Sequence, residues 1–151
     1  MALEIEILAG GRAKSAPEHQ MALAYLTRAR DTARALGFSS LALSEVDERK
    51  PEKIVEACAG APLLIALDEH GKSLSSDAFA KQLATWRDAG EARALFVIGG
   101  PDGLPAAVKP RARLTLAYGT QTWPHLLVRT MLAEQLFRAM TILSGHPYHR
   151  V

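Results

Sequence analysis

Two short apolar runs, residues 63–67 and 94–98, contain no charged or strongly polar side chain. This composition is typical of a strand that is buried on both faces, because neither face meets water. Such strands occur mainly in parallel sheets that helices cover on both sides. The two runs therefore favour a fold in which strands and helices alternate along the chain.

Patterns typical of strands and helices do alternate through most of the 151 residues. Strands are expected at 3–8, 41–46, 63–67, 94–98 and 114–116. Helices are expected at 17–36, at 51–59 and from a cap at Ser75 or Ser76 to Gly90, and a polar turn is expected at 68–72. No repeat or linker divides the chain. We predict a single α/β domain over residues 1–151, with a mostly parallel sheet and helices on both faces.

The segment 126–143 holds neither proline nor glycine, and its apolar side chains would cover nearly the whole circumference of a helix. The sheet of the same chain can cover one face of such a helix. A second copy of the chain is the simplest cover for the other face. This pattern predicts a homodimer that is packed through the C-terminal helix.

Composition limits the setting in which the protein works. Arginine outnumbers lysine by twelve to six, and arginine binds phosphate oxygens bidentately. A nucleic-acid partner is therefore compatible with the composition, although a surface with ordinary ion pairs would look the same. The only cysteine, Cys58, excludes an internal disulfide and is expected at a buried helix position. No apolar run approaches the ~20 residues of a membrane span, so we expect a soluble cytoplasmic protein.

Three loops are expected at the carboxyl ends of the strands, where open parallel sheets bind ligands. They are the loop after Leu67, the glycine-rich loop 99–103 and the loop 118–123. Glycine lets the backbone approach a ligand closely. The loop 99–103 lacks the lysine of a phosphate loop, so a plain tight turn is an equal alternative. Tyr118 and Trp123 have the alternative of being core aromatics.

Four motifs occur in the order and spacing of one known family. They are Leu67-Asp68, the run Ile98 to Leu104, the run Thr122 to His125 followed by Arg129 and 134–139, and His146-Pro147-Tyr148-His149. With them the chain resembles the ribosomal large subunit methyltransferase H family, of the SPOUT class of S-adenosylmethionine-dependent RNA methyltransferases. The match is specific from Leu63 to Arg150 and looser from Met1 to Lys50.

The resemblance implies an α/β fold with a C-terminal trefoil knot, a rare exception to unknotted topology, and a homodimer packed through the last helix. It implies methylation of N3 of a pseudouridine in large-subunit (23S) ribosomal RNA, on the assembled ribosome. It also implies a S-adenosylmethionine site made by Leu67, Gly99, Tyr118, Gly119, Thr120, Gln121, Thr122 and Trp123. Gly119, Gln121 and Trp123 depart from the residues usual in the family, which puts their side-chain contacts to the cofactor in doubt.

Two residues near the start of the last helix are candidates for catalysis. N3–H of pseudouridine is largely protonated near neutral pH, so a group must accept or relay its proton. His125 is the first candidate, because imidazole titrates near neutrality; its alternative is a hydrogen bond to the backbone of the helix start. Arg129 would stabilise the anion or bind phosphate, and its alternative is an interface ion pair. Glu134 is expected to pair with Arg138, four residues on.

The last residues form a short basic and aromatic tail. Tyr148 offers a stacking face for a base, and His149 and Arg150 complete the expected substrate-binding group. In a dimer this tail could reach the cofactor pocket of the partner. His146 and His149 lack further ligands at fitting spacing, so no metal is expected. Two other functions stay open, a small nucleotide-binding α/β enzyme and a non-catalytic ribosome-binding module.

Overall fold

Five strands form one sheet in the computed structural model, which describes residues 2–150. Across the sheet they lie in the order β2 (Phe38–Val46), β1 (Leu3–Gly10), β4 (Arg93–Ile98), β3 (Leu63–Lys72) and β5 (Leu114–Leu116). Every pairing between these strands is parallel. The predicted α/β class with a parallel sheet is confirmed. The C-terminal knot stays a prediction.

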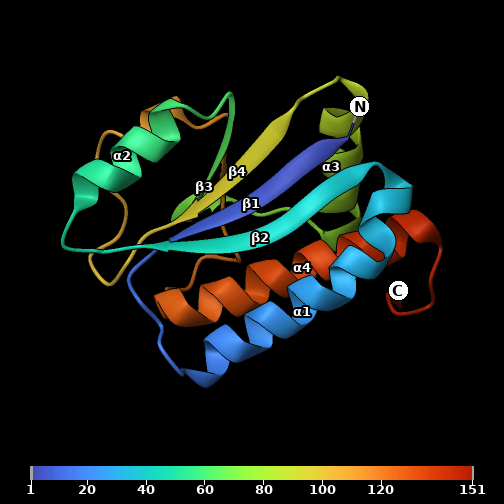
Figure 1. Ribbon diagram of the computed structural model, residues 1–151, viewed down its shortest axis with the longest axis horizontal. Helices are drawn as coiled ribbons and strands as arrows, with labels where there is room; N and C mark the ends of the chain where they lie inside the picture. Colours follow the sequence, from blue (N-terminus) through green and yellow to red (C-terminus); the bar gives the residue numbers. More distant parts are fainter. Residues whose placement is uncertain (1, 151) are drawn as a thin grey trace.

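Helices cover both faces of the sheet (Figure 1). The helices α1 (Pro17–Ala33), α3 (Ser76–Asp88) and α4 (His125–Ser144) lie on one face, and α2 (Pro51–Ala59) lies on the other. Neighbouring residues of a strand point to opposite faces, so Ile65 joins the core under α1, α3 and α4, whereas Leu64 joins the core under α2. None of the described helices is long and apolar enough to cross a membrane.

The core under α2 contains Cys58, which is buried as predicted. Burial raises the pKa of the Cys58 thiol above its ordinary value, because it disfavours the charged thiolate. A buried thiol of this kind is unreactive. Cys58 is therefore a packing residue.

The C-terminal helix α4 lies beside α1 on the same face of the sheet (Figure 1). Its buried apolar side chains include Leu132, Leu136, Phe137 and Met140. The second face of this helix is thus covered largely by α1 of the same chain, and not by a second copy alone. A homodimer stays a prediction.

Residues 68–72 continue β3, so the predicted polar turn is wrong. The backbone N–H of Ala117 donates to the Lys72 carbonyl (3.0 Å), which keeps the segment paired with the chain after β5. Gly71 permits this approach, because a Cβ there would lie 2.7 Å from the Thr115 carbonyl carbon. The polar side chains are tolerated because this part of the strand runs along the edge of the sheet, beyond a register shift that follows Leu67.

The remaining expected elements are found with small shifts at their ends. β2 begins at Phe38, three residues before the expected start, and the last turn of the first helix is a 3₁₀ turn, Arg34–Leu36. Gly37 ends that turn with φ 89°, a left-handed conformation that favours glycine. Ser75 is the cap of α3, since its hydroxyl accepts the backbone N–H of Ala78 (3.1 Å).

Candidate active site

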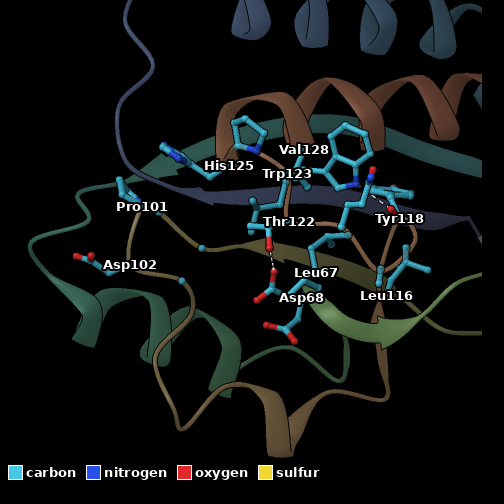
Figure 2. Close-up of a pocket in the computed structure, with 18 residues that line it drawn as sticks. Leu67, Asp68, Pro101, Asp102, Leu116, Tyr118, Thr122, Trp123, His125 and Val128 are labelled. Atoms are coloured by element: carbon cyan, nitrogen blue, oxygen red, sulfur yellow. Dashed lines mark hydrogen bonds between the residues drawn. The ribbon is translucent and has the colours of Figure 1, made fainter.

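A cavity of about 570 Å³ opens beyond the carboxyl ends of β3, β4 and β5 (Figure 2). This is the edge at which open parallel sheets bind ligands, and small-molecule sites have volumes of roughly 300–1,000 Å³. Its walls come from the end of β3, the glycine-rich loop 99–103, the loop 117–124 and the first turn of α4. The apolar part of the wall consists of Leu67, Ile98, Leu116, Trp123 and Val128.

Most of the residues predicted for cofactor binding line this one cavity. They are Leu67, Gly99, Tyr118, Gln121, Thr122 and Trp123. Gly119 and Thr120 are exposed and lie outside the lining. Gly119 turns the loop with φ 80°, and its backbone N–H donates to the Ser73 hydroxyl (3.1 Å). The structure therefore gives Gly119 a part in holding the shape of the loop.

Side-chain hydrogen bonds close the loop 117–124 over the end of β3. The indole N–H of Trp123 donates to the Tyr118 carbonyl (2.8 Å), and the Thr122 hydroxyl donates to the Glu69 carboxylate (Figure 2). Trp123 is 38% exposed, so it is not a core aromatic. Tyr118 packs against the core, and burial of its hydroxyl raises its pKa. One aromatic of the pair is thus largely structural and the other faces the cavity.

The glycine-rich loop is both a tight turn and a wall of the cavity. The backbone N–H of Gly103 donates to the Gly100 carbonyl (2.9 Å), which closes the turn. A Cβ on Gly99 would lie 2.4 Å from the Gly103 carbonyl carbon, which is closer than real contacts allow. Only glycine fits at residue 99, because the two ends of the loop touch there. Backbone groups, not side chains, form this part of the lining.

Three carboxylates on the lining were not among the predicted site residues. They belong to Asp68, Glu69 and Asp102. Lys109 lies 3.5 Å from the Asp68 carboxylate and offsets part of this charge. Their positions, directly after a buried strand and within the glycine-rich loop, could have pointed to the cavity. The sequence pattern of residues 68–72 instead predicts a solvated turn. An acidic wall favours ligands that carry positive charge.

His125 is the first residue of α4 and lies half-buried at the rim of the cavity. In Figure 2 its ring points away from Trp123 and Tyr118. Pro124 caps the helix with its carbonyl, which accepts the backbone N–H of Val128 (3.1 Å). No hydrogen bond within residues 2–150 involves the His125 ring, so the alternative of a backbone-bonded histidine is wrong for this chain. Its ring nitrogens are free to meet a ligand.

Arg129 lies one turn further along α4, is 0% exposed and does not line the cavity. Its guanidinium donates to Glu45 (2.5 Å) at the end of β2 and to the Gly11 carbonyl (2.7 Å) after β1. The Glu45 carboxylate also accepts the backbone N–H of Ala13 (2.8 Å). Partial burial raises the pKa of Glu45, but these two hydrogen bonds outweigh it and bring the pKa below its ordinary value. The ion pair joins two residues of one chain.

The C-terminal tail folds back onto the middle of α4. The Tyr148 hydroxyl donates to Glu134 (2.8 Å), and its ring meets the Phe137 ring at 4.7 Å in a T-shaped arrangement. Burial and the Glu134 hydrogen bond raise the pKa of Tyr148 to about 12. Glu134 also pairs with Arg138 (2.6 Å), which confirms that prediction. Tyr148 is therefore anchored on α4 of the same chain.

The other two residues of the predicted substrate group lie beside Tyr148. His149 Nδ1 is 3.0 Å from the Arg138 guanidinium, and Arg150 is exposed. Tyr148 meets α4 at Glu134, nine residues beyond His125, which is about 14 Å along the helix at 1.5 Å per residue, and none of residues 146–150 lines the cavity. The cavity and the tail of one chain therefore do not meet. Among residues 2–150, no three ligand-type side chains gather in a way that could hold a metal ion.

Comparison with known proteins agrees with this arrangement. A family model described as "Predicted SPOUT methyltransferase" matches residues 3–149. A protein of Nitrobacter winogradskyi is 46% identical and one of Caulobacter vibrioides is 48% identical, each over 98% of this chain and 99% of its own length. Both are named ribosomal RNA large subunit methyltransferase H. The chain belongs to the methyltransferase H family of SPOUT methyltransferases.

A solved structure described as a probable methylase family protein, from Haemophilus influenzae, shares the fold. It superposes with a TM-score of 0.52 at 13% identity, over 99% of this chain and 70% of that one. For a methyltransferase H family member, the cavity at the carboxyl edge is the candidate active site. The acidic wall and the free imidazole of His125 are its polar groups.

Proposed function

We propose that this chain transfers the methyl group of S-adenosylmethionine to N3 of a pseudouridine in large-subunit (23S) ribosomal RNA. The substrate would be the assembled ribosome in the cytoplasm. The observation that carries the proposal is that a cofactor-sized cavity ends at the unbonded ring of His125, in a chain of the methyltransferase H family. The name of the relatives, which includes ribosomal RNA, supports the substrate class.

The residues of the cavity fit S-adenosylmethionine. Leu67, Ile98 and Leu116 offer apolar surface of the kind that nucleoside rings bind. The carboxylates of Glu69 and Asp102 offer negative charge to a ligand with a sulfonium and an ammonium group. When bound, this cofactor supplies an activated, electrophilic methyl group. The protein then mainly has to align the attacking nitrogen and handle its proton.

His125 is the residue that we propose for the proton. It lines the cavity, and its ring nitrogens are free of hydrogen bonds within residues 2–150. The imidazole would accept the N3 proton as the nitrogen takes the methyl carbon and the bond from that carbon to sulfur breaks, with S-adenosylhomocysteine as the leaving group; water would then remove the proton from the imidazole. The first turn of α4 presents the imidazole at the cavity rim, where water reaches it.

Arg129 takes a different role from the one that its type suggested. It is fully buried and bonded to Glu45 and Gly11, so it does not touch a ligand in the cavity. We propose that it is a positioning residue. By tying the first turn of α4 to the ends of β1 and β2, it holds His125 in place.

We also propose that the active form is a homodimer. Apolar side chains remain exposed along α1 and α4, most of all Met21, which is 53% exposed beside half-buried Met131. A second hollow of about 310 Å³ lies between these helices. A partner seated there would bring its tail, with Tyr148, His149 and Arg150, toward a cavity that the tail of the same chain does not reach. Light scattering should therefore give twice the mass of one chain, and truncation after Ser144 should abolish transfer but keep that mass.

The decisive experiment is methyl transfer from labelled S-adenosylmethionine to assembled ribosomes that lack the modification, with free large subunits in parallel. Mass spectrometry would locate the new methyl group. We expect N3-methylpseudouridine, formed mainly on assembled ribosomes. Methylation at another nucleotide would disprove the proposed target. Binding of the cofactor without any transfer would disprove the ribosomal substrate.

A further inference from the structure

The loops after β1 and β2 lie side by side at the same edge of the sheet as the candidate active site. β1 and β2 pair as far as Gly10 and Val46, and the backbone N–H of Gly11 donates to the Val46 carbonyl (2.7 Å). Figure 1 shows both connections at the end of the molecule where α4 begins. The two connecting segments, 11–16 and 47–53, therefore start side by side, and they then lead to α1 on one face of the sheet and to α2 on the other.

Four cationic side chains project from these two segments. Arg12 and Lys14 come from the first, and Lys50 and Lys53 come from the second. All four are exposed, and none forms a salt bridge within residues 2–150. We call them the basic rim.

The acidic side chains of these segments offset part of that positive charge. Asp47 is paired with Arg49 (3.0 Å). Glu48 and Glu52 are both exposed, and Oε2 of Glu48 lies 2.8 Å from where a Cβ of Gly11 would be. With five cations and three acids, the two segments account for the net charge of the whole chain, which is +2.

The first segment is held rigidly. Arg129 binds the Gly11 carbonyl (2.7 Å), and Glu45 binds the backbone N–H of Ala13 (2.8 Å). Lys14 has φ 53°, in the left-handed region that a lysine seldom adopts. Such a conformation persists only where the surrounding structure holds it, and it is common at functional sites. Cations on a fixed loop lose little conformational freedom when they bind a partner.

The segment that carries Arg12 and Lys14 starts beside the cavity. A Cβ built on Gly11 would lie 4.0 Å from Nε2 of His125. A Cβ built on Gly10 would lie 2.8 Å from the backbone nitrogen of Gly100, which lines the cavity. A polymer whose reacting unit entered the cavity at His125 would thus pass over Arg12 and Lys14.

We propose that the basic rim binds the phosphate backbone of the RNA that flanks the target nucleotide. This inference rests on the proposed function, because RNA is the polymer that the cavity would receive. Exposed lysine and arginine side chains attract phosphates by releasing counterions, and such contacts set position and register without reading sequence. The acidic lining of the cavity repels phosphates, so the backbone stays on the rim while the base enters.

The test compares ribosome binding by two rim variants and a matched control. The rim variants are Arg12→Gln with Lys14→Gln, and Lys50→Gln with Lys53→Gln. The control is Arg34→Gln with Lys81→Gln, which removes one exposed arginine and one exposed lysine outside the two rim segments. Affinity for assembled ribosomes is measured over a series of salt concentrations. Methyl transfer is measured separately.

The slope of log affinity against log salt is negative, and each rim variant should make it shallower by about 1.5. Each variant removes two phosphate contacts, and each lost contact accounts for roughly 0.7–0.9 of the slope. Affinity at low salt should fall roughly tenfold or more, and KM for ribosomes should rise more than kcat falls. The control should follow the wild type in slope and affinity. Equal losses in rim and control variants would overturn the proposal, because they would reflect overall charge.

The two proposals fail in different ways. If the wild type methylates ribosomes and the rim variants keep its salt slope, the basic rim is not the contact and the function stands. If the wild type binds ribosomes through the rim but transfers no methyl group, the proposed reaction is wrong and the RNA contact stands. If the wild type binds no ribosomes, both are wrong.

Discussion

The guanidinium of Arg129 lies 2.5 Å from the Glu45 carboxylate and joins residues that are 84 positions apart in the sequence. Arg129 is 0% exposed, whereas the side chain of Glu45 is 27% exposed. The pair ties the first turn of α4 to the end of the edge strand β2. Arg129 also donates to the Gly11 carbonyl (2.7 Å), so this one side chain ties α4 to the ends of both β1 and β2.

Removing Glu45 should destabilise the protein more than an ordinary surface change. Glu45→Ala leaves a buried guanidinium without its counter-charge, which costs about 3–5 kcal/mol in buried pairs. We expect the lower end of that range, since the Gly11 carbonyl still accepts from Arg129. Urea unfolding should show a lower midpoint at an unchanged slope. Asp31→Ala, at an exposed position on α1, is the control.

The double variant Glu45→Ala with Arg129→Met tests whether the two charges are coupled energetically. Methionine removes the buried charge, so the double variant should be more stable than Glu45→Ala alone. If it is equally or less stable, the two charges are not coupled.

The ion pair should also make stability depend on pH in the acid range. The pKa of Glu45 is lowered in the folded protein from an ordinary value of 4.5. A lowered pKa means that the stabilisation is present above about pH 4.5 and is lost as the pH falls through the folded-state pKa. The stability difference between wild type and Glu45→Gln should therefore be constant above about pH 4.5 and narrow as the pH falls below it. A difference that stays constant below about pH 4.5 as well would contradict the assignment.

The sequence predicted the sheet well because burial leaves a local mark. Runs such as 63–67 and 94–98 are apolar on both faces, and both are strands within the sheet. Residues 68–72 carry no such mark. Their polar side chains resemble a turn, but Gly71 lets the strand approach Thr115 at the sheet edge. Contacts between distant segments decided this element, and a local pattern does not contain them.

The same limit applies to the site. The three cavity loops could be predicted, because the ends of parallel strands meet at one edge. The partner of Arg129 could not, since nothing near Arg129 in the sequence points to Glu45. The sequence allowed Trp123 to be either a cavity residue or a core aromatic, and only its 38% exposure in the structure decides between the two. Whether a polar residue faces a ligand or another residue depends on packing across the chain.

Gly99→Ala should damage cofactor binding. The added Cβ would lie 2.4 Å from the Gly103 carbonyl carbon, so the backbone of the cavity wall must move. Overpacking costs about 1–3 kcal/mol of folding stability. The shifted wall should also lower the affinity for S-adenosylmethionine by roughly fivefold or more, the equivalent of about 1 kcal/mol. Calorimetric titration measures it. Gly60→Ala is the control, because its Cβ would meet only the Ala57 carbonyl at 3.9 Å; normal binding by Gly99→Ala would place the cofactor elsewhere.

Tyr148→Phe should loosen the tail. The hydroxyl bond to Glu134 is worth about 1 kcal/mol, so amide exchange at residues 146–150 should speed up roughly fivefold. Tyr25→Phe is the matched control, since the Tyr25 hydroxyl makes no hydrogen bond within residues 2–150. The pKa of Tyr148 is raised from 10 to about 12, so the stabilisation is present below pH 10 and is lost as the pH rises toward 12. An equal change in both variants would show that the effect does not come from the bond between Tyr148 and Glu134.

His125→Gln should slow methyl transfer far more than it weakens cofactor binding. Glutamine keeps a polar side chain at the cavity rim but does not accept a proton near neutral pH. Loss of a general base lowers rates by roughly 10²–10⁴-fold. Single-turnover transfer at saturating ribosomes gives the rate, and a separate titration gives the affinity for S-adenosylmethionine. Equal losses of rate and affinity would make His125 a structural residue, because a proton acceptor acts only once the cofactor is already bound.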